Sequence, residues 1–427
     1  MSPVTRTPGA GPSATTTVDA DGPGLPPAGV LTGWYRDLHH WPELSGLEQR
    51  TAAVLADRLG TWGWQVHRQV GGEGVVALLD AGPGPTVVLR AELDGLPVRE
   101  QTDLPFRSVR EQRLGEHTVP VSHACGHDVH LVAACGAAAA LAASRSRWGG
   151  RVAVVLQPAE ETGSGARAML ADGLRDLVGP ADHLLALHTS ALPTGQVTFR
   201  PGQMTSAGLD VSLTFLGEGG HAAWSTSAPT PVQRAAEWVH RVSGRLGGEG
   251  SVLTVGSMTA GSCANVVADR AELRLSLRAD TAAACQDLLR EVRRSVHGAA
   301  QPAGGRSEVA IRAVYEPAVN DDGTSGPVYQ ALRTARVPTY LLPAPSRACD
   351  DVGTLADGLG AGLAYWFVGA NDAALFSAAD LDLVRAGEQP RGVPGNHSPR
   401  FAPDPAVLPE AARQLLLAAR GCLAAPG

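Results

Sequence analysis

The chain has 427 residues, 44% of them apolar, and a formal net charge of −7 from 35 basic and 42 acidic side chains. All 35 basic side chains are arginines, which excludes P-loop proteins, Schiff-base and pyridoxal-phosphate enzymes and the usual protein kinases, because each of these needs a lysine amine. The mild acidity and the lack of a basic run argue against nucleic acid as a partner.

Residues 1–29 hold six Pro and five Gly, with neither a charged start nor an apolar segment. We therefore expect an unstructured tail rather than a secretory signal. The longest apolar run, Leu131–Ala143, is well short of the roughly 20 residues that span a membrane. Six widely spaced cysteines form no disulfide framework, and a reducing cytoplasm is the expected location.

From residue 30 onward, short apolar strands alternate with helices. This order predicts an α/β fold with a mostly parallel sheet covered by helices on both faces. In such sheets ligands bind beyond the carboxyl ends of the strands. The expected elements are an amphipathic helix at Leu47–Leu59, strands at Thr86–Arg90, Arg151–Gln157 and Leu184–His188, and a buried helix at His130–Ala143.

After about Pro201 the pattern changes to strand-helix-strand-strand-helix-strand, the order of a small ferredoxin-like α/β sandwich. We interpret it as an insertion, because strand-helix alternation resumes afterwards. The predicted boundaries are 204–316 for the inserted domain, and 30–203 with 317–427 for the main domain. The inserted elements are predicted at Asp210–Gly217, Thr230–Leu246, Ser251–Ala260, Arg270–Arg278, Thr281–Val296 and Glu308–Tyr315.

The densest polar cluster is the stretch 123–130, which holds three His, one Cys and one Asp. Thiolate, imidazole and carboxylate ligands together favour Zn²⁺ or a neighbouring transition ion. A buried cysteine beside capping histidines is the alternative. Glu160 and Glu161 directly follow a predicted strand, where one could bind a metal and the other could move protons; alone, such a pair is more often a solvated acidic turn.

Three further histidines have an ordinary explanation when each is taken alone. His188 ends an apolar strand and fits a satisfied core residue, His397 fits a surface loop, and His221 fits an exposed turn in the inserted domain. Taken together, the clusters supply one thiolate, three imidazoles and two carboxylates at strand ends. That set is enough for two metal ions and one general base.

The order of these motifs resembles the zinc-carboxypeptidase/aminoacylase metallopeptidase superfamily. Within it, the chain is most similar to the amidohydrolase branch of hippurate hydrolase, N-acyl-amino-acid amidohydrolase and indole-acetyl-amino-acid hydrolase. Cys125 and His188 mark this branch. The matching stretches are 89–97, 123–128 (His-Ala-Cys-Gly-His-Asp), 157–161 (Gln-Pro-Ala-Glu-Glu), 187–188, 219–223 (Gly-Gly-His-Ala-Ala), 265–269 and 397–399.

The resemblance implies a role for each matched residue. Two divalent ions, Zn²⁺ or Mn²⁺, would be held by a set of five side chains: Cys125, His127, Glu161, His188 and His397. Glu160 would be the general base and acid, with His221 polarising the substrate carbonyl from the inserted domain, which would act as a lid. Asp94 would orient a ligand histidine from behind. Asn265 and Arg278 would hold the substrate.

The implied activity is hydrolysis of the amide bond of an N-acyl amino acid by a homodimer joined through the lid. A dipeptidase or carboxypeptidase with the same mechanism, a deacylase of one biosynthetic intermediate and an inactive metal-binding scaffold stay open as alternatives. Several positions depart from the family pattern, although none is an implied ligand or the base. They are Glu92, Trp224-Ser225, 230–232, Ala268 and 349–351.

Overall fold

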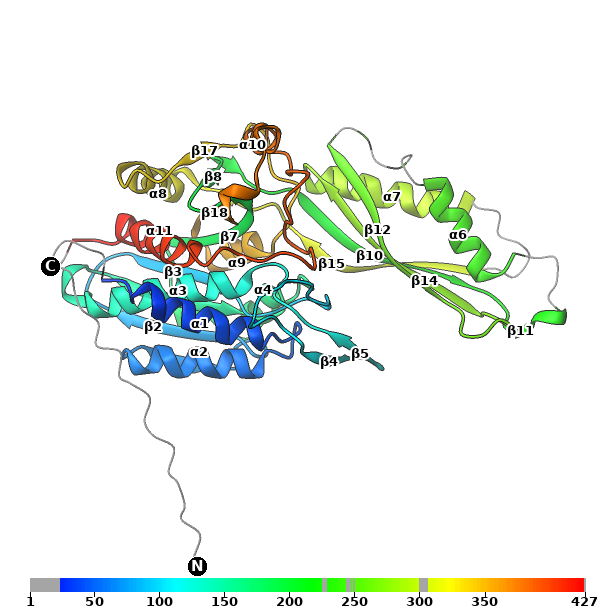
Figure 1. The fold of residues 1–427 in the computed structure, drawn as a ribbon, viewed down its shortest axis with the longest axis horizontal. Helices are drawn as coiled ribbons and strands as arrows, with labels where there is room; N and C mark the ends of the chain where they lie inside the picture. The colour runs from blue at the N-terminus through cyan, green and yellow to red at the C-terminus, as the bar shows by residue number, and fades with distance from the viewer. Residues whose placement is uncertain are drawn as a thin grey trace, which may run out of the picture.

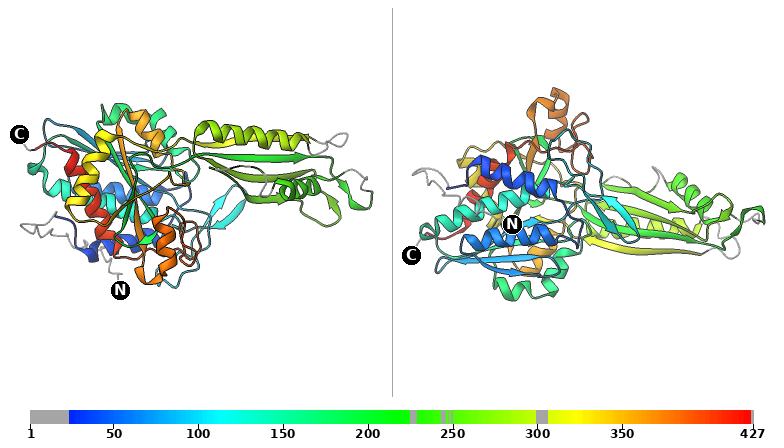
Figure 2. Two further views of the ribbon diagram at one scale, coloured as in Figure 1. Left: turned by 90° about the horizontal axis from the view of Figure 1, so that it is seen from above. Right: turned by 60° about the horizontal axis from the view of Figure 1, so that its bottom comes forward.

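The computed structural model describes residues 24–224, 229–242, 246, 248, 250–298 and 306–425. The chain forms a large α/β body, from which a smaller α/β lobe projects (Figures 1 and 2). We call these two parts the body and the lid. Most of residues 1–29 lie outside the described part, but helix α1 begins at Ala28, inside the predicted tail. Leu25 already packs against the core, so the folded chain starts earlier than composition indicated.

The body is built on an eight-stranded sheet in the order β1-β2-β6-β3-β7-β18-β8-β17. The four central strands β6, β3, β7 and β18 are parallel, and β1 and β2 pair antiparallel with their neighbours. At the other edge, β8 pairs antiparallel with β18 and parallel with β17. The strands are β1 (Gln65–Arg68), β2 (Val75–Asp80), β3 (Thr86–Glu92), β6 (Arg151–Gln157), β7 (His183–Pro193), β8 (Val197–Phe199), β17 (Thr339–Leu341) and β18 (Gly362–Asn371).

Helices cover both faces of this sheet, as the alternation of elements predicts. One face carries α1 (Ala28–His40), α2 (Gln49–Thr61), α3 (His127–Ala143), α8 (Asp322–Thr334) and α11 (Val407–Cys422). The other face carries α4 (Gly165–Ala171), α5 (Leu174–Val178), α9 (Val352–Leu359) and α10 (Ala378–Arg385).

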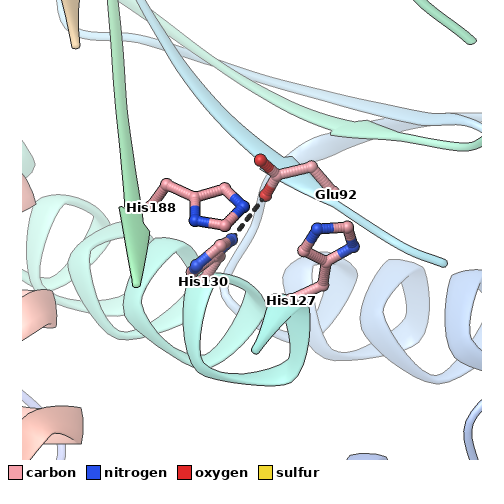
Figure 3. Close-up of side chains that lie close together, drawn as sticks. All are labelled: Glu92, His127, His130 and His188. Carbon is pink, nitrogen blue, oxygen red and sulfur yellow. Dashed lines mark hydrogen bonds and ion pairs between the residues drawn. The ribbon is translucent and has the colours of Figure 1, made fainter. Parts of the chain in front are cut away.

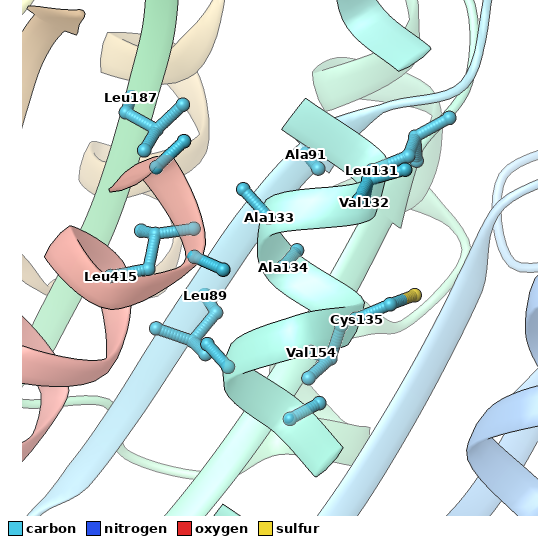
Figure 4. Close-up of a cluster of buried hydrophobic side chains, with 14 of the residues drawn as sticks. Leu89, Ala91, Leu131, Val132, Ala133, Ala134, Cys135, Val154, Leu187 and Leu415 are labelled. Atoms are coloured by element: carbon cyan, nitrogen blue, oxygen red, sulfur yellow. The ribbon is translucent and has the colours of Figure 1, made fainter. Parts of the chain in front are cut away.

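Helix α3 positions the metal-ligand motif at its first turn. It is buried on nearly all sides, which is why its sequence is apolar without a polar face. Figure 4 shows it lying between the central strands and α11. Small residues permit this close packing: a side chain at Gly136 would meet the Cβ atom of Ala412 at 3.0 Å. The start of α3 is thereby fixed against the strand ends.

The lid has a four-stranded antiparallel sheet in the order β12-β14-β10-β15. Its helices cover one face and enclose a separate hydrophobic core. Alternating burial along β14 matches the predicted pattern, with Leu273, Leu275 and Leu277 buried. The elements are β10 (Ala207–Leu216), α6 (Pro231–Val242), β12 (Ser251–Ala260), β14 (Arg270–Ala279), α7 (Ala282–Gly298) and β15 (Arg306–Tyr315).

Short elements complete the described chain, and sequence patterns did not predict them. They are β4 (Glu111–Leu114), β5 (His117–Pro120), β9 (Gly202–Gln203), β11 (Gly220–His221), β13 (Val266–Val267), β16 (Val319–Asn320) and the 3-10 turns 145–147, 222–224 and 373–375. Among the described residues, every helix is too short or too polar to cross a lipid bilayer.

Candidate metal centre and active site

Five side chains of ligand type meet at the edge of the sheet where β3 and β6 end, and one of them, His188, lies within the longer strand β7. The Cys125 Sγ atom lies 3.4 Å from His188 Nε2 and 3.3 Å from His397 Nε2. Glu161 Oε1 lies 3.6 Å from His397 Nε2 and 3.8 Å from His127 Nε2. The five residues come from the loop before α3, its first turn, the loop after β6, strand β7 and the loop before α11. The structure thus brings the whole expected ligand set together.

Hydrogen bonds on the far side of each ring orient His127, which is buried, and His188, which is half-buried. His127 donates from Nδ1 to the main-chain oxygen of Asp94, at 2.8 Å. His188 donates from Nδ1 to the main-chain oxygen of Thr189, at 2.7 Å. Each bond fixes the tautomer that leaves the Nε2 lone pair directed at the cluster, which is the arrangement of metal-binding histidines.

His397 is held by its backbone in an unusual conformation. Its φ angle of +68° lies in the left-handed region, which costs energy for a residue with a side chain. The His397 amide donates to Ala124, and the Asn396 amide side chain donates to the main-chain oxygen of Cys125. These bonds tie the loop before α11 to the loop before α3 and hold the His397 ring over Cys125.

The residues present fit divalent cations. His127 Nε2 and Glu161 Oε1 are buried and have no hydrogen-bond partner, and such buried orphan atoms are costly unless something pairs with them. Burial and the neighbouring charges of Glu161 and Glu160 raise the pKa of the Cys125 thiol well above its ordinary value. A cation placed among these atoms would pair with the orphans and favour the thiolate.

Glu160 stands beside this cluster on a strained turn. Its Oε2 atom lies 3.8 Å from His127 Nε2. The preceding residue, Ala159, has a φ of +51°, and its amide donates to the buried carboxylate of Glu48 at 2.8 Å. Asp94 Oδ2 accepts from the Glu161 amide at 3.0 Å. Two buried carboxylates therefore hold the backbone on either side of Glu160.

The surroundings of Glu160 favour its protonated form. Burial, followed by the charges of Asp350 and Glu161, raises the pKa of Glu160 well above the ordinary value of a glutamate. Bound cations would act in the opposite direction, because a positive charge favours the carboxylate. A carboxyl group in such a setting can both accept and return a proton, which is the property that a general acid and base requires.

Beneath Glu160 lies a charged network that sequence patterns did not predict. Arg90 is buried and donates to Glu92, Asp350, Asp351 and Gln157. The facing carboxylates outweigh the effect of burial and raise the pKa of Arg90, while Arg90 keeps the pKa of Glu92 well below its usual range. Asp350 and Asp351 each place a carboxylate oxygen close to Glu160.

A second group of ligand-type side chains adjoins the first. Figure 3 shows Glu92, His127, His130 and His188 side by side. Both ring nitrogens of His130 have partners, however: Nδ1 donates to Glu92 at 2.7 Å, and Nε2 accepts from the Thr189 amide at 2.8 Å. His130 has no free lone pair and supports the cluster rather than joining it. The sequence signal for His130 was its place in the polar cluster 123–130, one helical turn after His127.

The cluster opens into a cavity of about 1010 Å³ between the body and the lid, and Arg278 of β14 lines its lid side. The Arg278 guanidinium stacks over the Tyr315 ring at 5.2 Å, and its Nη1 atom has no hydrogen-bond partner. Cys349, one of the departures from the family pattern, also lines the cavity. Arg278 is therefore available to an anionic group bound beside the cluster.

The structure does not bring His221 and Asn265 into this cavity. They lie together on the short pairing of β11 with β13, where the Ala222 amide donates to the Asn265 main-chain oxygen at 3.0 Å. Both side chains are exposed. Figure 1 shows β11 at the end of the lid farthest from the body.

Comparisons with known proteins identify the family of this chain. Residues 88–383 match the model of peptidase family M20/M25/M40, which is more than half of the sequence. The chain belongs to this family. Among its relatives, hippurate hydrolase of Campylobacter jejuni is 32% identical over 57% of this chain and 62% of that protein. N-acetyldiaminopimelate deacetylase of Oenococcus oeni is 27% identical over 75% of this chain and 85% of that protein.

A solved member of the family has the same fold. The dinuclear metal-binding peptidase YXEP of Bacillus subtilis superposes with a TM-score of 0.67, at 23% identity, over 92% of this chain and 97% of that chain. The expectation of an amidohydrolase-type α/β fold with an inserted lid is thereby confirmed.

Proposed function

We propose that this M20-family protein hydrolyses the amide bond of an N-acyl amino acid with the help of two divalent metal ions. The observation that carries the proposal is the convergence of a five-residue ligand cluster, a separate carboxyl group and an arginine, Arg278, whose Nη1 atom has no hydrogen-bond partner, on one cavity. The names of the relatives, a hippurate hydrolase and a deacetylase among them, support this substrate class.

The ligands of the ions would be the five clustered side chains, and Zn²⁺ or Mn²⁺ suits their mixture of sulfur, nitrogen and oxygen. Bound ions supply a lowered pKa for water and polarisation of a carbonyl oxygen. Glu160 takes the proton from the attacking water and later gives it to the leaving amine nitrogen. Asp94 holds both His127 and the Glu161 amide in place. The ligand set is Cys125, His127, Glu161, His188 and His397.

The lid supplies substrate recognition in this proposal. Arg278 presents a bidentate, permanently charged fork that suits a carboxylate. His221 and Asn265 would serve the site of a second subunit, because the tip of their own lid lies away from their own cavity. We therefore propose a homodimer joined through the lid, with 204–316 as the lid and 30–203 with 317–427 as the catalytic domain.

Activity on a substrate panel tests this proposal. Metal-loaded protein should release free amine from N-acetyl and N-benzoyl amino acids. It should not require a dipeptide as its substrate. Faster cleavage of dipeptides than of every N-acyl amino acid would favour a dipeptidase instead. Stoichiometric metal without turnover of any compound would favour an inactive scaffold.

Replacing Cys125 by serine should weaken metal retention. A hydroxyl is a much poorer ligand than a thiolate for soft transition ions, and Cys125 lies within 3.4 Å of both His188 and His397. Elemental analysis after dialysis should find about two ions per wild-type chain and fewer in the variant. Cys135→Ser, at a buried cysteine outside the cluster, is the matched control. Equal metal content in all three proteins would contradict the ligand role.

Replacing Arg278 by alanine should raise KM for substrates with a free carboxylate far more than for the corresponding amides. Charge-assisted hydrogen bonds contribute roughly 1.5–3 kcal/mol, so we expect KM for the acid to rise about 10- to 100-fold. Arg274→Ala is the control, because Arg274 is an exposed residue of the same strand that does not line the cavity. Equal effects on acids and amides would refute the anchor role.

A further inference from the structure

We propose that the catalytic body binds the acyl half of the substrate on an apolar wall, and that the preferred acyl group is aromatic or medium-chain aliphatic rather than acetyl. This inference rests on the function proposed above. The wall consists of Leu192, Leu342, Phe367 and Val384, which all line the cavity.

The wall begins directly beside the metal cluster. Phe367 of β18 is the register partner of His188 of β7, and the two rings meet edge to face with 6.3 Å between their centroids. The Phe367 ring is therefore an apolar surface next to a ligand histidine of the cluster.

The wall residues are the part of a hydrophobic core that borders the cavity. Leu192, Phe367 and Val384 belong to the core cluster on the α4/α9 face of the sheet, and Leu342 packs against them. Each of the three is only 5–6% exposed, yet each contributes to the cavity surface. Water against such a surface finds few hydrogen-bond partners, so an apolar group that displaces it is favoured.

The charges of the cavity set the direction of the substrate. Arg278, on the lid side, takes the carboxylate of the amino-acid half, and Glu160 marks the scissile bond. An extended N-acyl amino acid then directs its acyl group away from the lid and along the wall.

The size of the cavity also favours an acyl group larger than acetyl. Its volume of about 1010 Å³ lies at the upper end of the range of about 300–1,000 Å³ that is typical of sites for drug-sized ligands. An acetyl group would leave the wall uncovered. A benzoyl or hexanoyl group would cover it.

A series of N-acetyl-, N-butanoyl-, N-hexanoyl- and N-benzoyl-alanine tests the inference with metal-loaded enzyme. Each buried methylene should raise kcat/KM about three- to fourfold, so the hexanoyl compound should exceed the acetyl compound about 100-fold. The Kd values of the same compounds, measured by calorimetry with the Glu160→Gln protein, should fall in the same order. Equal values for acetyl and hexanoyl compounds in both measurements would overturn the inference and leave the proposed hydrolase intact.

Failure of the enzyme to cleave any member of the series would count against the proposed function, while the Kd order would still decide whether the wall binds the acyl group.

Val384→Thr tests the wall itself, because it adds one hydroxyl at nearly the same volume. The hexanoyl-to-acetyl preference should drop about tenfold. Val328→Thr, in a helix on the opposite face of the sheet, is the matched control and should keep the full preference. An unchanged preference in Val384→Thr would refute the role of the wall.

Discussion

Glu160→Gln should reduce kcat by about 10⁴-fold or more while leaving metal content and KM nearly unchanged. General acid-base assistance is typically worth about 10²–10⁴-fold, and here one carboxyl group both accepts the proton of the attacking water and protonates the leaving amine. The amide of glutamine keeps the shape of the side chain but cannot carry the proton. Since Glu160 lies beside His127 without belonging to the five-residue cluster, its loss should not release metal.

Glu161→Gln should have the opposite signature, although the two residues are neighbours of the same type. Its Oε1 atom lies between His127 and His397, so the substitution removes a charged ligand oxygen. Metal content should fall, and activity should partly return when excess metal is added. No such rescue should occur in Glu160→Gln.

The paired measurement separates chemistry from metal binding. If Glu160→Gln holds its metal and stays within tenfold of wild type, a difference of about 1.4 kcal/mol, then Glu160 is not the base. If Glu160→Gln loses metal and Glu161→Gln keeps it, the two roles are exchanged.

The ligand cluster could be predicted from the sequence because its members carry local signals. Cys125 and His127 lie in one short motif, Glu160 and Glu161 follow an apolar strand, and His188 follows the apolar run 184–187, although its strand continues to Pro193. Parallel strands bring their carboxyl ends to the same edge of a sheet, so these signals converge without knowledge of long-range contacts. The alternation of apolar and polar residues along Arg270–Arg278 likewise predicts a strand from the local sequence alone.

The supporting residues could not be predicted in the same way. Glu48 precedes a surface-like amphipathic helix, yet its carboxylate reaches the Ala159 amide across 111 residues. Arg90 reads as the polar end of a strand, and only its packing against Asp350 and Asp351 shows that it is buried. The position of His221 depends on how the lid projects, which no local pattern encodes.

Arg90→Met should lower the free energy of unfolding by about 3–5 kcal/mol, because removing one partner of a buried ion pair leaves uncompensated charge. The guanidinium uses its Nε and both terminal nitrogens on buried partners. Methionine matches the length of the arginine stem but offers no donor, so three carboxylates would face one another without a cation. The affected carboxylates are Glu92, Asp350 and Asp351.

Urea denaturation of Arg90→Met, Arg90→Lys and Arg99→Met measures this effect. Arg99 pairs with Glu111 at 3.0 Å, but both side chains are about half exposed or more, and such surface pairs contribute only about 0–1 kcal/mol. Arg90→Lys should fall between the two methionine variants, since it keeps the charge and loses the fork that spans several carboxylates. Equal stability losses in Arg90→Met and Arg99→Met would contradict the role of Arg90 as the counter-charge of these carboxylates.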